Sequence, residues 1–468
     1  MIKCPNCGGE LKFKPSDKKV VCEYCGSTFN PKELNKEAKA STKAEKKDSL
    51  GNFEGYSYRC TQCGAELLNF DETAITFCSY CGSQAMIEDK MVKVNNPDYI
   101  IPFKITKEQC IEAYKKAINK AMFVPSYMKK DIVIDKFRGI YMPYCVYKVS
   151  YHETAVNIGA KYTGRSGDYD LYDDYQISGQ VDVDYDGISY DLISKLLDKY
   201  THHIPFDFKN AEDFNFNYMI GYYADMMDVK NNIYDGKAVR IVKNDTSKKM
   251  ALNKTFSKYG CADPHIDPKV ESRKIGMFPL YFLAIRDKDK NYIHYAVVNG
   301  ETGKIALDLP IDFKKYILGS LIISIPIFLL LDGNLLLLPK GIVIFSIIAS
   351  LISFIISSSQ IGKMAESEKH FDDLGYDSVN KTTKQEKNEY KKSVKKNYKN
   401  IRIAQIISMI IGIGVLMLNP VSDLYYYGAS IIVFVMTIIS FLSLVRQHNI
   451  LASNKLPQLE KRGGEENE

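Results

Sequence analysis

The sequence predicts a multidomain protein with two small β zinc ribbons, an α+β cytosolic domain with an antiparallel sheet, and a four-helix transmembrane region. Three observations support this: paired cysteines near the N-terminus, alternating strand-like and helical patterns in the middle, and two long apolar regions near the C-terminus. The 468 residues are enough for several domains. A net charge of +6 over that length is far below the balance of a dedicated nucleic-acid-binding protein.

Eight of the eleven cysteines form two sets with identical spacing. In each set two CxxC pairs are separated by fourteen residues, and each cysteine of the second set lies 56 residues after its counterpart. Two turns that each present two thiolates suit tetrahedral zinc, with metal–sulfur distances of about 2.3 Å. We therefore predict a tandem duplication that binds two structural zinc ions. The metal ligands would be Cys4, Cys7, Cys22 and Cys25 in the first set, and Cys60, Cys63, Cys78 and Cys81 in the second.

Other uses of these cysteines are less favoured. The N-terminus has no apolar stretch typical of a cleavable secretion signal, so we expect reduced thiols rather than a disulfide framework. Thioredoxin-like chemistry requires a βαβ unit around the CxxC pair, which these short segments do not provide. An iron–sulfur cluster held by four thiolates stays open as an alternative to zinc. Four protein ligands leave no coordination position for a substrate, so neither cluster is expected to be catalytic.

The soluble part of the chain divides into four segments. We predict ribbon 1 at 1–30, a charged linker at 31–56, ribbon 2 at 57–90 and the α+β cytosolic domain at 98–312. Thr106 and Gln109 form a capping box that begins an amphipathic helix. A further helix is expected near 189–200. Strands are expected at Tyr141–Tyr151, Ala155–Tyr162, Gln176–Val183, Phe278–Ile285 and Tyr292–Val298, with a hairpin turn at 299–303.

An internal similarity links two parts of this domain. Gly139–Tyr144 is similar to Gly276–Tyr281, which suggests two related half-domains. Their prolines, Pro143 and Pro279, are expected at strand starts or on sheet edges, where a missing N–H is tolerated.

Other candidate sites in the domain are weaker. Asp182, Asp184 and Asp186 begin like a calcium loop, but Ile193 stands where the glutamate ligand would be. The pair His202 and His203 has no cysteine or acidic pair at ligand spacing. No arrangement of a nucleophile with a base can be named, and the catalytic and cofactor-binding residues are predicted to be none.

Two apolar regions, 316–356 and 403–446, are each about twice the roughly 20 residues that cross a bilayer, so each is predicted to be a transmembrane hairpin. The loop 357–402 between them holds eleven basic and seven acidic residues, whereas the short turns hold only Lys340. Because cytoplasmic loops are enriched in Lys and Arg, we place this loop, the polar tail at 447–468 and both termini in the cytoplasm of a multi-pass cell-membrane protein. Contact of the basic segment 381–402 with anionic lipid is a secondary expectation.

The CxxC pairs, each followed by glycine, resemble the transcription factor IIB-type zinc ribbon over 1–30 and 57–86. The whole order of domains resembles a group of bacterial membrane proteins that carry such ribbons. Their cytosolic domain has motifs like Ile101–Ile105, Gly139–Pro143 and Ala296–Lys304. Some members resemble partners of phage-shock-type and flotillin-like membrane-stress proteins, and this resemblance implies an adaptor role.

Charge favours protein partners over nucleic acid. Ribbon 1 has five lysines and three acids, ribbon 2 has one arginine and three acids, and a zinc–tetrathiolate centre adds −2 to each. Ribbon 2 would therefore repel phosphates. The leading hypothesis is a non-enzymatic, membrane-anchored zinc-binding adaptor that recruits cytosolic or membrane proteins, in a membrane-stress response. The alternatives are a membrane-tethered nucleic-acid-binding regulator using the ribbons, and an enzyme or transporter.

Overall fold

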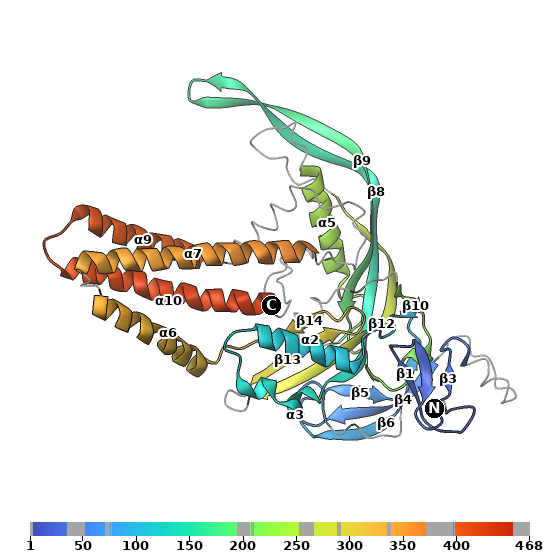
Figure 1. Ribbon diagram of the computed structural model, residues 1–468. Coiled ribbons are helices and arrows are strands. Elements are labelled where there is room, and N and C mark those ends of the chain that lie inside the picture. The colour runs from blue at the N-terminus through green and yellow to red at the C-terminus, as the bar shows by residue number, and fades with distance from the viewer. Residues whose placement is uncertain are drawn as a thin grey trace.

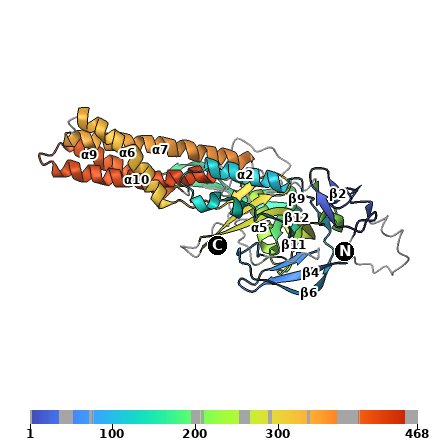
Figure 2. The same cartoon turned by 60° about the horizontal axis from the view of Figure 1, so that its bottom comes forward.

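The computed structural model describes residues 3–34, 52–70, 75, 77–193, 206, 210–251, 266–287, 292–334, 338–370, 396 and 398–452. Figure 1 shows three parts: a body built around a large β-sheet, a long two-stranded arm, and a bundle of helices that extends from one side of the body. In the turned view of Figure 2 the bundle again leads away from the body in one direction.

Ribbon 1 is a small antiparallel sheet that packs against the body. Its strands are β1 (Leu11–Lys14), β2 (Lys19–Cys22) and β3 (Thr28–Phe29). Alternation along β1 places Leu11 and Phe13 on a buried face, as expected for a strand with one covered side. The Phe13 N–H donates to the Ile220 carbonyl at 3.0 Å, and its ring lies 5.3 Å from the ring of Tyr218. The apolar face of ribbon 1 is thus used within the chain.

Ribbon 2 is continuous with the main sheet rather than a separate small domain. Its strands are β4 (Asn52–Cys60), β5 (Glu66–Asn69) and β6 (Met86–Asn95). The short strand β11 (Tyr223–Asp225) pairs with β5 on one side and with the body on the other. Residues 52–56, predicted as linker, lie in β4, and β6 extends past the predicted end at 90.

The main sheet has eleven strands in the described part of the chain. Its order is β10-β7-β12-β8-β11-β5-β4-β6, with β9 paired to β8 and the β13–β14 ladder paired to β12. Most pairs are antiparallel as predicted, but β7–β12 and β8–β11 are parallel. The strands not yet given are β7 (Tyr99–Ile100), β8 (Arg138–Ser166), β9 (Tyr169–Asp191), β10 (Glu212–Asp213), β12 (Lys269–Asp287), β13 (Tyr292–Asn299) and β14 (Ile305–Leu307).

The two similar segments lie on the two central strands and have equivalent surroundings. Along one edge of β8, the parallel strand β11 pairs first and the antiparallel strand β9 pairs further along the chain. Along one edge of β12, the parallel strand β7 and the antiparallel strand β13 follow each other in the same way. A glycine beside an aromatic ring recurs: a Cβ on Gly139 would lie 2.5 Å from the Tyr222 ring, and one on Gly276 would lie 2.5 Å from the Tyr99 ring. This arrangement supports the two predicted half-domains.

The expectation for the two prolines was wrong. Pro143 and Pro279 lie inside β8 and β12, paired with each other's strand. Each occupies the gap where one neighbouring strand ends and the next begins, so the missing N–H leaves no ladder bond unmade. Each carbonyl accepts from the residue just after the second neighbour, Leu192 at 2.9 Å and Gly300 at 2.8 Å.

The predicted helix at the start of the domain is confirmed. It is α2 (Lys107–Lys120), and both bonds of the Thr106–Gln109 capping box are present. Its buried residues include Cys110 and Tyr114, four residues apart on one face, as an amphipathic helix requires. In contrast, residues 189–191 of the helix predicted near 189–200 belong to β9, and 194–200 lie outside the described residues. The other helices of the body within the described ranges are η1 (Ser126–Lys129), α3 (Asp131–Ile134), η3 (Phe216–Tyr218) and α5 (Asp235–Ala251).

Three motifs that lie far apart in the sequence meet in the body. The backbone N–H groups of Lys104 and Ile105 donate to the Gly300 carbonyl at 2.8 and 2.9 Å. The Lys104 ammonium lies 3.2 Å from the buried Glu301 carboxylate. Tyr141 brings in the third motif, because its hydroxyl accepts from the Phe103 N–H at 3.3 Å and its ring lies 5.0 Å from that of Phe103. The other face of the Phe103 site is closed by Tyr222, which stacks on the ring with 4.2 Å between centroids. Residues 299–303 form a hairpin turn as predicted, with the Gly303 N–H donating to the Asn299 carbonyl at 2.9 Å.

Asp225 is a buried carboxylate at the junction of ribbon 2 with the sheet. Its Oδ1 accepts from the Met226 N–H at 2.8 Å, while Oδ2 has no hydrogen-bond partner among the described residues. Burial raises the pKa of Asp225 well above its usual value.

We predict that Asp225→Asn stabilises the protein, and more so at higher pH. Because the pKa of the Asp225 carboxyl is higher in the folded state than in the unfolded state, the protein loses stability as the pH rises from the lower pKa to the higher one. The free energy of unfolding falls by about 1.4 kcal/mol per pH unit in that range. The amide keeps the bond from Met226 without carrying a charge. Thermal unfolding of the detergent-solubilised chain at pH 5 and pH 8 measures the difference. An advantage that is equal at both pH values would contradict the prediction.

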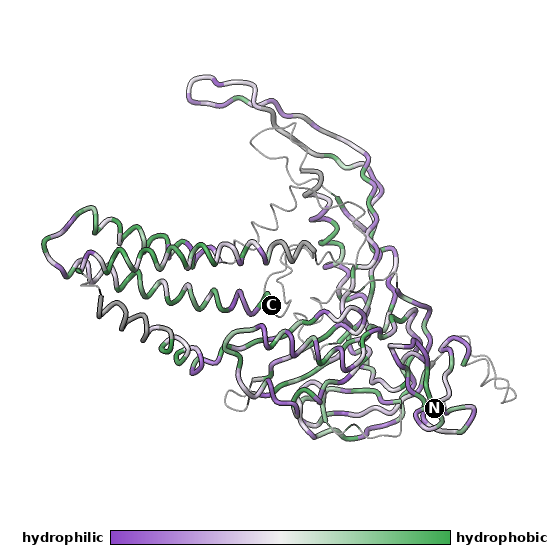
Figure 3. Tube along the Cα trace, in the orientation of Figure 1, coloured by the Kyte–Doolittle hydropathy of each residue, from purple (hydrophilic) through white to green (hydrophobic). Residues whose placement is uncertain are grey.

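The helical bundle contains α6 (Phe313–Asn334), α7 (Pro339–His370), α9 (Lys399–Leu418) and α10 (Leu424–Ala452). Among the described residues, three segments are long and apolar enough to cross a membrane: Pro339–Met364, Lys399–Leu418 and Leu424–Leu451. Figure 3 shows these helices coloured as hydrophobic over much of their length. Four spans were predicted, and α6 is not one of the three found.

The helices also extend beyond the predicted boundaries. Helix α7 continues to His370, so the start of the predicted 357–402 loop is helical, and α10 continues to Ala452 in the predicted tail. Most of the basic segment 381–402 lies outside the described residues.

A buried amide connects three helices of the bundle. The Gln405 Nε2 atom of α9 donates to the Ser350 carbonyl of α7 at 2.9 Å. Its Oε1 atom accepts from the Ser440 hydroxyl of α10, also at 2.9 Å. Such bonds hold helices together where the surroundings cannot satisfy polar groups.

The bundle is attached to the body at one corner, residues 120–124. Asn449 of α10 accepts from the Met122 N–H at 2.9 Å and donates to the Met122 carbonyl at 3.1 Å. At the start of α6, the Lys315 ammonium donates to the Val124 carbonyl at 2.7 Å. Both ends of the helical region therefore bind the same turn.

Candidate metal centres

The structure brings the eight predicted cysteines together into two clusters. Within each cluster the four sulfur atoms all lie within 4.8 Å of one another. In the first cluster the Sγ atoms of Cys4 and Cys25 are 3.7 Å apart, and those of Cys7 and Cys22 are 3.5 Å apart. A tetrahedron with metal–sulfur distances of about 2.3 Å has edges of about 3.8 Å. The first cluster therefore fits a tetrahedral metal ion.

The second cluster has the same geometry. The Sγ atoms of Cys60 and Cys81 are 3.6 Å apart, as are those of Cys63 and Cys78. Both clusters thus fit the donor set that zinc prefers in structural sites.

Four equivalent turns present the thiols. In each turn the N–H of the glycine after the second cysteine donates to the carbonyl of the first, at 2.8–3.0 Å. These glycines have φ values of +70° to +74°, a conformation that disfavours other residues. Among the described residues, apart from the two chain neighbours of each glycine, no atom lies within 4 Å of a Cβ built on Gly8 or Gly26, so the requirement for glycine there is conformational rather than steric.

Two serines support the thiols. The hydroxyl of Ser27 lies 3.1 Å from the Cys25 sulfur, and that of Ser83 lies 3.0 Å from the Cys81 sulfur and 3.4 Å from that of Cys60. Ser27 and Ser83 were not predicted to have a role at the sites, but they recur at the same 56-residue interval as the cysteines, and this interval is the signal that could have identified them.

The electrostatics of each cluster favour a bound cation. The hydrogen bond with Ser27 lowers the pKa of Cys25 to about 6. Burial acts to raise the pKa of Cys60, but the bond with Ser83 and nearby backbone N–H groups lower it to about 6. The Gly9 N–H acts to lower the pKa of Cys7, yet hydrogen bonds with neighbouring thiols raise it to about 12. Four thiolates can therefore coexist only with a positive charge between them.

The two clusters differ in their surroundings. Tyr24, between the last two cysteines of ribbon 1, has 85% of its surface exposed. Its counterpart in ribbon 2, Tyr80, is 3% exposed and packs against Phe282 of β12, with 5.4 Å between ring centroids. The turn between the last two cysteines therefore packs against the body in ribbon 2, whereas in ribbon 1 its tyrosine is exposed to solvent.

A third group of ligating side chains does not form a comparable site. His152, Asp184 and Glu271 come together on the surface, and all three are exposed. The Lys148 ammonium lies 2.7 Å from the Glu271 carboxylate and 3.9 Å from that of Asp184, so a cation of the chain already offsets part of the negative charge of the group. The calcium-loop pattern at Asp182–Gly187 lies in strand β9 rather than in a loop.

The other sites considered in the sequence fall in the core or outside the described residues. Cys110 is fully buried, and burial raises the pKa of its thiol well above the usual value. Cys145 is also buried and donates to the Asn231 carbonyl at 3.4 Å. Both cysteines therefore pack in the core, as small apolar side chains. Cys261 and the pair His202 and His203 lie outside the described residues.

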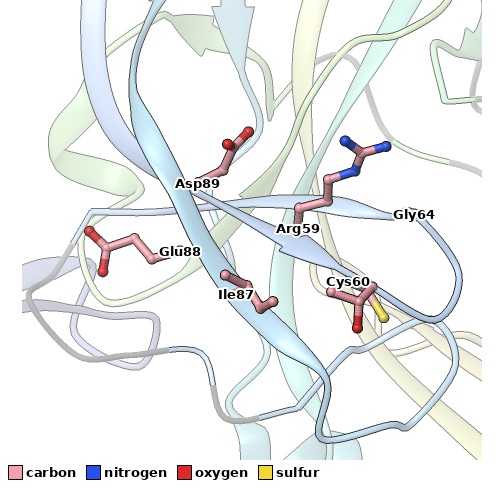
Figure 4. Close-up of a pocket in the computed structure, with 7 residues that line it drawn as sticks. Arg59, Cys60, Gly64, Ile87, Glu88 and Asp89 are labelled. Atoms are coloured by element: carbon pink, nitrogen blue, oxygen red, sulfur yellow. The ribbon is translucent and has the colours of Figure 1, made fainter.

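A cavity of about 360 Å³ lies behind the first turn of ribbon 2. Figure 4 shows Arg59 and Glu88 extending to opposite sides of it, with the metal-ligand candidate Cys60 at one end. Its lining offers one guanidinium and two carboxylates, but no nucleophile paired with a base. The lining residues are Arg59, Cys60, Thr61, Gly64, Ile87, Glu88 and Asp89.

Comparison with known proteins gives one similarity of useful length. The chain is 26% identical over 322 residues to a Bacillus subtilis (strain 168) protein named uncharacterized protein YdjG. The alignment covers 67% of this chain and 91% of the relative. No family model and no solved structure matches. The chain is thus a multidomain protein with two tetra-cysteine clusters, a sheet-rich body and helices long and apolar enough to cross a membrane.

Proposed function

We propose that the protein is a non-enzymatic, membrane-anchored zinc-binding adaptor that recruits protein partners to the cytosolic face of the cell membrane. Two zinc ions, one in each cluster, would hold ribbons of the transcription factor IIB type. The membrane-stress setting implied by the family resemblance is part of this proposal.

The anchor in this proposal has four spans and cytoplasmic termini. Helix α6 would be the fourth span, since its 22 residues include a long apolar run that begins directly after Lys314 and Lys315. The excess of basic residues between the two hairpins supports a cytoplasmic position for the loop and both termini.

A single observation carries the adaptor role, and it is the contrast between Tyr24 and Tyr80. The same duplicated turn binds an aromatic surface of the body in ribbon 2, and in ribbon 1 it presents its tyrosine to solvent. Tyrosine is enriched in protein interfaces because its ring gives a large apolar contact and its hydroxyl a hydrogen bond. Ribbon 1 is therefore the surface for the partner.

The test replaces Tyr24 or Tyr80 with a photo-crosslinking phenylalanine derivative in cells. We expect position 24 to crosslink to other proteins and position 80 to crosslink only within the chain. Recovery of nucleic acid from position 24 would favour the regulator hypothesis instead. If position 24 gave no intermolecular product, the adaptor role of ribbon 1 would be wrong.

We further predict that Tyr24→Ala reduces partner recovery at least about tenfold, as expected when a central interface aromatic is truncated. The zinc content of the purified protein should stay at two ions per chain, because the side chain does not ligate the metal. Met91→Ala on β6 is the matched control, since Met91 is an exposed apolar residue of ribbon 2. Equal recovery with both variants would count against the proposal.

A further inference from the structure

The β8–β9 hairpin extends beyond the sheet as a long arm. Strand β12 pairs with β8 only up to Ser150, whereas β9 continues to pair with β8 as far as Ser166 and Tyr169. From Thr154 to Gln180 the arm is therefore a ribbon of two strands. A two-stranded ribbon has no core of its own and is marginally stable alone in water.

The tip of the arm, residues 162–172, carries large apolar side chains in the solvent. Tyr169 is 79% exposed, Leu171 48% and Tyr162 44%. The rings of Tyr162 and Tyr172 lie 5.6 Å apart, so they form a pair on one side of the ribbon. The strand register places Tyr162 and Tyr172 on one face of the ribbon and Tyr169 and Leu171 on the other, so the contact surface that they indicate is the whole end of the arm rather than one side of it.

The position of the tip indicates what it contacts. In Figure 1 the helical bundle runs along the horizontal, and the arm curves toward the same side, so that its tip lies level with the first turn of α6. Figure 2 is turned about that horizontal axis, which leaves this level unchanged. The first turn of α6 contains Lys314, Lys315 and Tyr316, residue types typical of a membrane–water interface. With α6 as the fourth span of the proposed anchor, the tip lies at the depth of the membrane–water interface.

The charge of the tip indicates whether it would contact anionic headgroups or insert aromatic rings among neutral ones. Between 161 and 174 there are two basic residues, Lys161 and Arg165, and four acids, Asp168, Asp170, Asp173 and Asp174. Arg165 is already 3.9 Å from the Asp170 carboxylate. A negative tip is not attracted to anionic headgroups. Tyrosine rings, in contrast, partition to the headgroup level of any bilayer.

We propose that the tip of the arm inserts Tyr162, Tyr169 and Leu171 into the headgroup region of the same membrane that holds the bundle, as a contact with neutral lipid. This inference rests on the proposed membrane anchoring. It gives the body a second point of contact with the bilayer, to the side of the bundle, and so fixes the orientation of the body over the lipid surface.

The experiment uses the absence of tryptophan from the chain, because a single introduced Trp is then the only indole. Tyr169→Trp is placed in the full-length protein and reconstituted into phosphatidylcholine vesicles with or without brominated acyl chains. Tyr425→Trp, at the far end of the bundle, is the control for embedding, and Tyr24→Trp in ribbon 1 is the control for a water-exposed position. Leu171→Trp is a second reporter of the tip.

We expect brominated lipid to reduce the emission of both tip reporters about twofold, as for aromatic side chains at the interface. Tyr24→Trp should be unaffected, and replacing half of the lipid with anionic phosphatidylglycerol should not increase quenching at the tip. If Tyr425→Trp is quenched but neither tip reporter is, the arm proposal is overturned and the anchor stands. If Tyr425→Trp is also unquenched, the membrane anchoring itself is wrong, and the arm proposal with it.

Discussion

Cys78→Ser is expected to unfold ribbon 2 and to weaken the main sheet with it. Structural zinc contributes about 10–16 kcal/mol of apparent binding free energy in small metal-dependent domains, which exceeds the whole stability of many domains. Cys78 is fully buried, and β5 of the same ribbon pairs with β11 inside the sheet. Loss of the metal therefore exposes both the sheet and the surface around Phe282 where Tyr80 packs. Zinc content should fall from two ions per chain to one, and limited proteolysis should cleave within the body.

Cys22→Ser is the matched control for this prediction. It removes the equivalent ligand from ribbon 1, whose three strands form a separate sheet. The zinc content should fall by the same amount, while the β8–β12 core stays resistant to protease. Equal protease sensitivity of the two variants would show that ribbon 2 has no special role in the sheet. Two bound zinc ions in both variants would contradict the assignment of the ligands.

Gly300→Ala is expected to have the second large effect. A Cβ at this position would lie 2.4 Å from the ring of Phe103 and 2.9 Å from the Pro279 side chain. Phe103 is fully buried and stacked on Tyr222, so its ring has little room to move. Overpacking of this kind costs about 1–3 kcal/mol and occasionally more. A clear decrease in the midpoint of thermal unfolding of the solubilised protein should follow.

Gly236→Ala tests whether the effect comes from the contact. Gly236 lies in α5, and in the part of the chain that the structure describes a Cβ there meets no atom within 4 Å beyond its chain neighbours and the backbone of its own helix. Alanine is favoured over glycine in a helix by up to about 1 kcal/mol, so this variant should be as stable as the natural sequence or more so. A Gly300→Ala protein with an unchanged unfolding midpoint would mean that the side chains around Gly300, Phe103 and Pro279 are loosely packed.

The clusters could be predicted from sequence because zinc ligation has a local signature. Both halves of each site are two cysteines on one turn, so spacing alone identifies Cys4 through Cys81 as two sets of four. The spacing does not show which side of a ribbon packs against the rest of the protein. The burial of Tyr80 depends on Phe282, about two hundred residues away, and nothing local to Tyr24 and Tyr80 distinguishes them.

For the fold as well, features that depend on neighbouring residues were predicted correctly, and features that depend on distant residues were not. The capping box of α2 and the turn at 299–303 were correct, since a few neighbouring residues determine each. The prolines were misplaced because the sequence does not show which strand lies beside Pro143. The three-residue strand β11, which joins ribbon 2 to the sheet, is too short to give a periodic pattern. The apolar runs predicted the membrane helices, but the uncharged Gln405 did not stand out as a link between them.

The corner at residues 120–124 has a consequence for how the protein responds to its surroundings. Helices α6 and α10 both bind that turn, and the turn directly follows α2. A change in the tilt of either helix, such as a thinner bilayer would favour, cannot be absorbed by a flexible tether. Such a change would either break these hydrogen bonds or rotate the body together with the helices, so in the proposed membrane-anchored state the corner would couple the tilt of α6 and α10 to the orientation of ribbon 1.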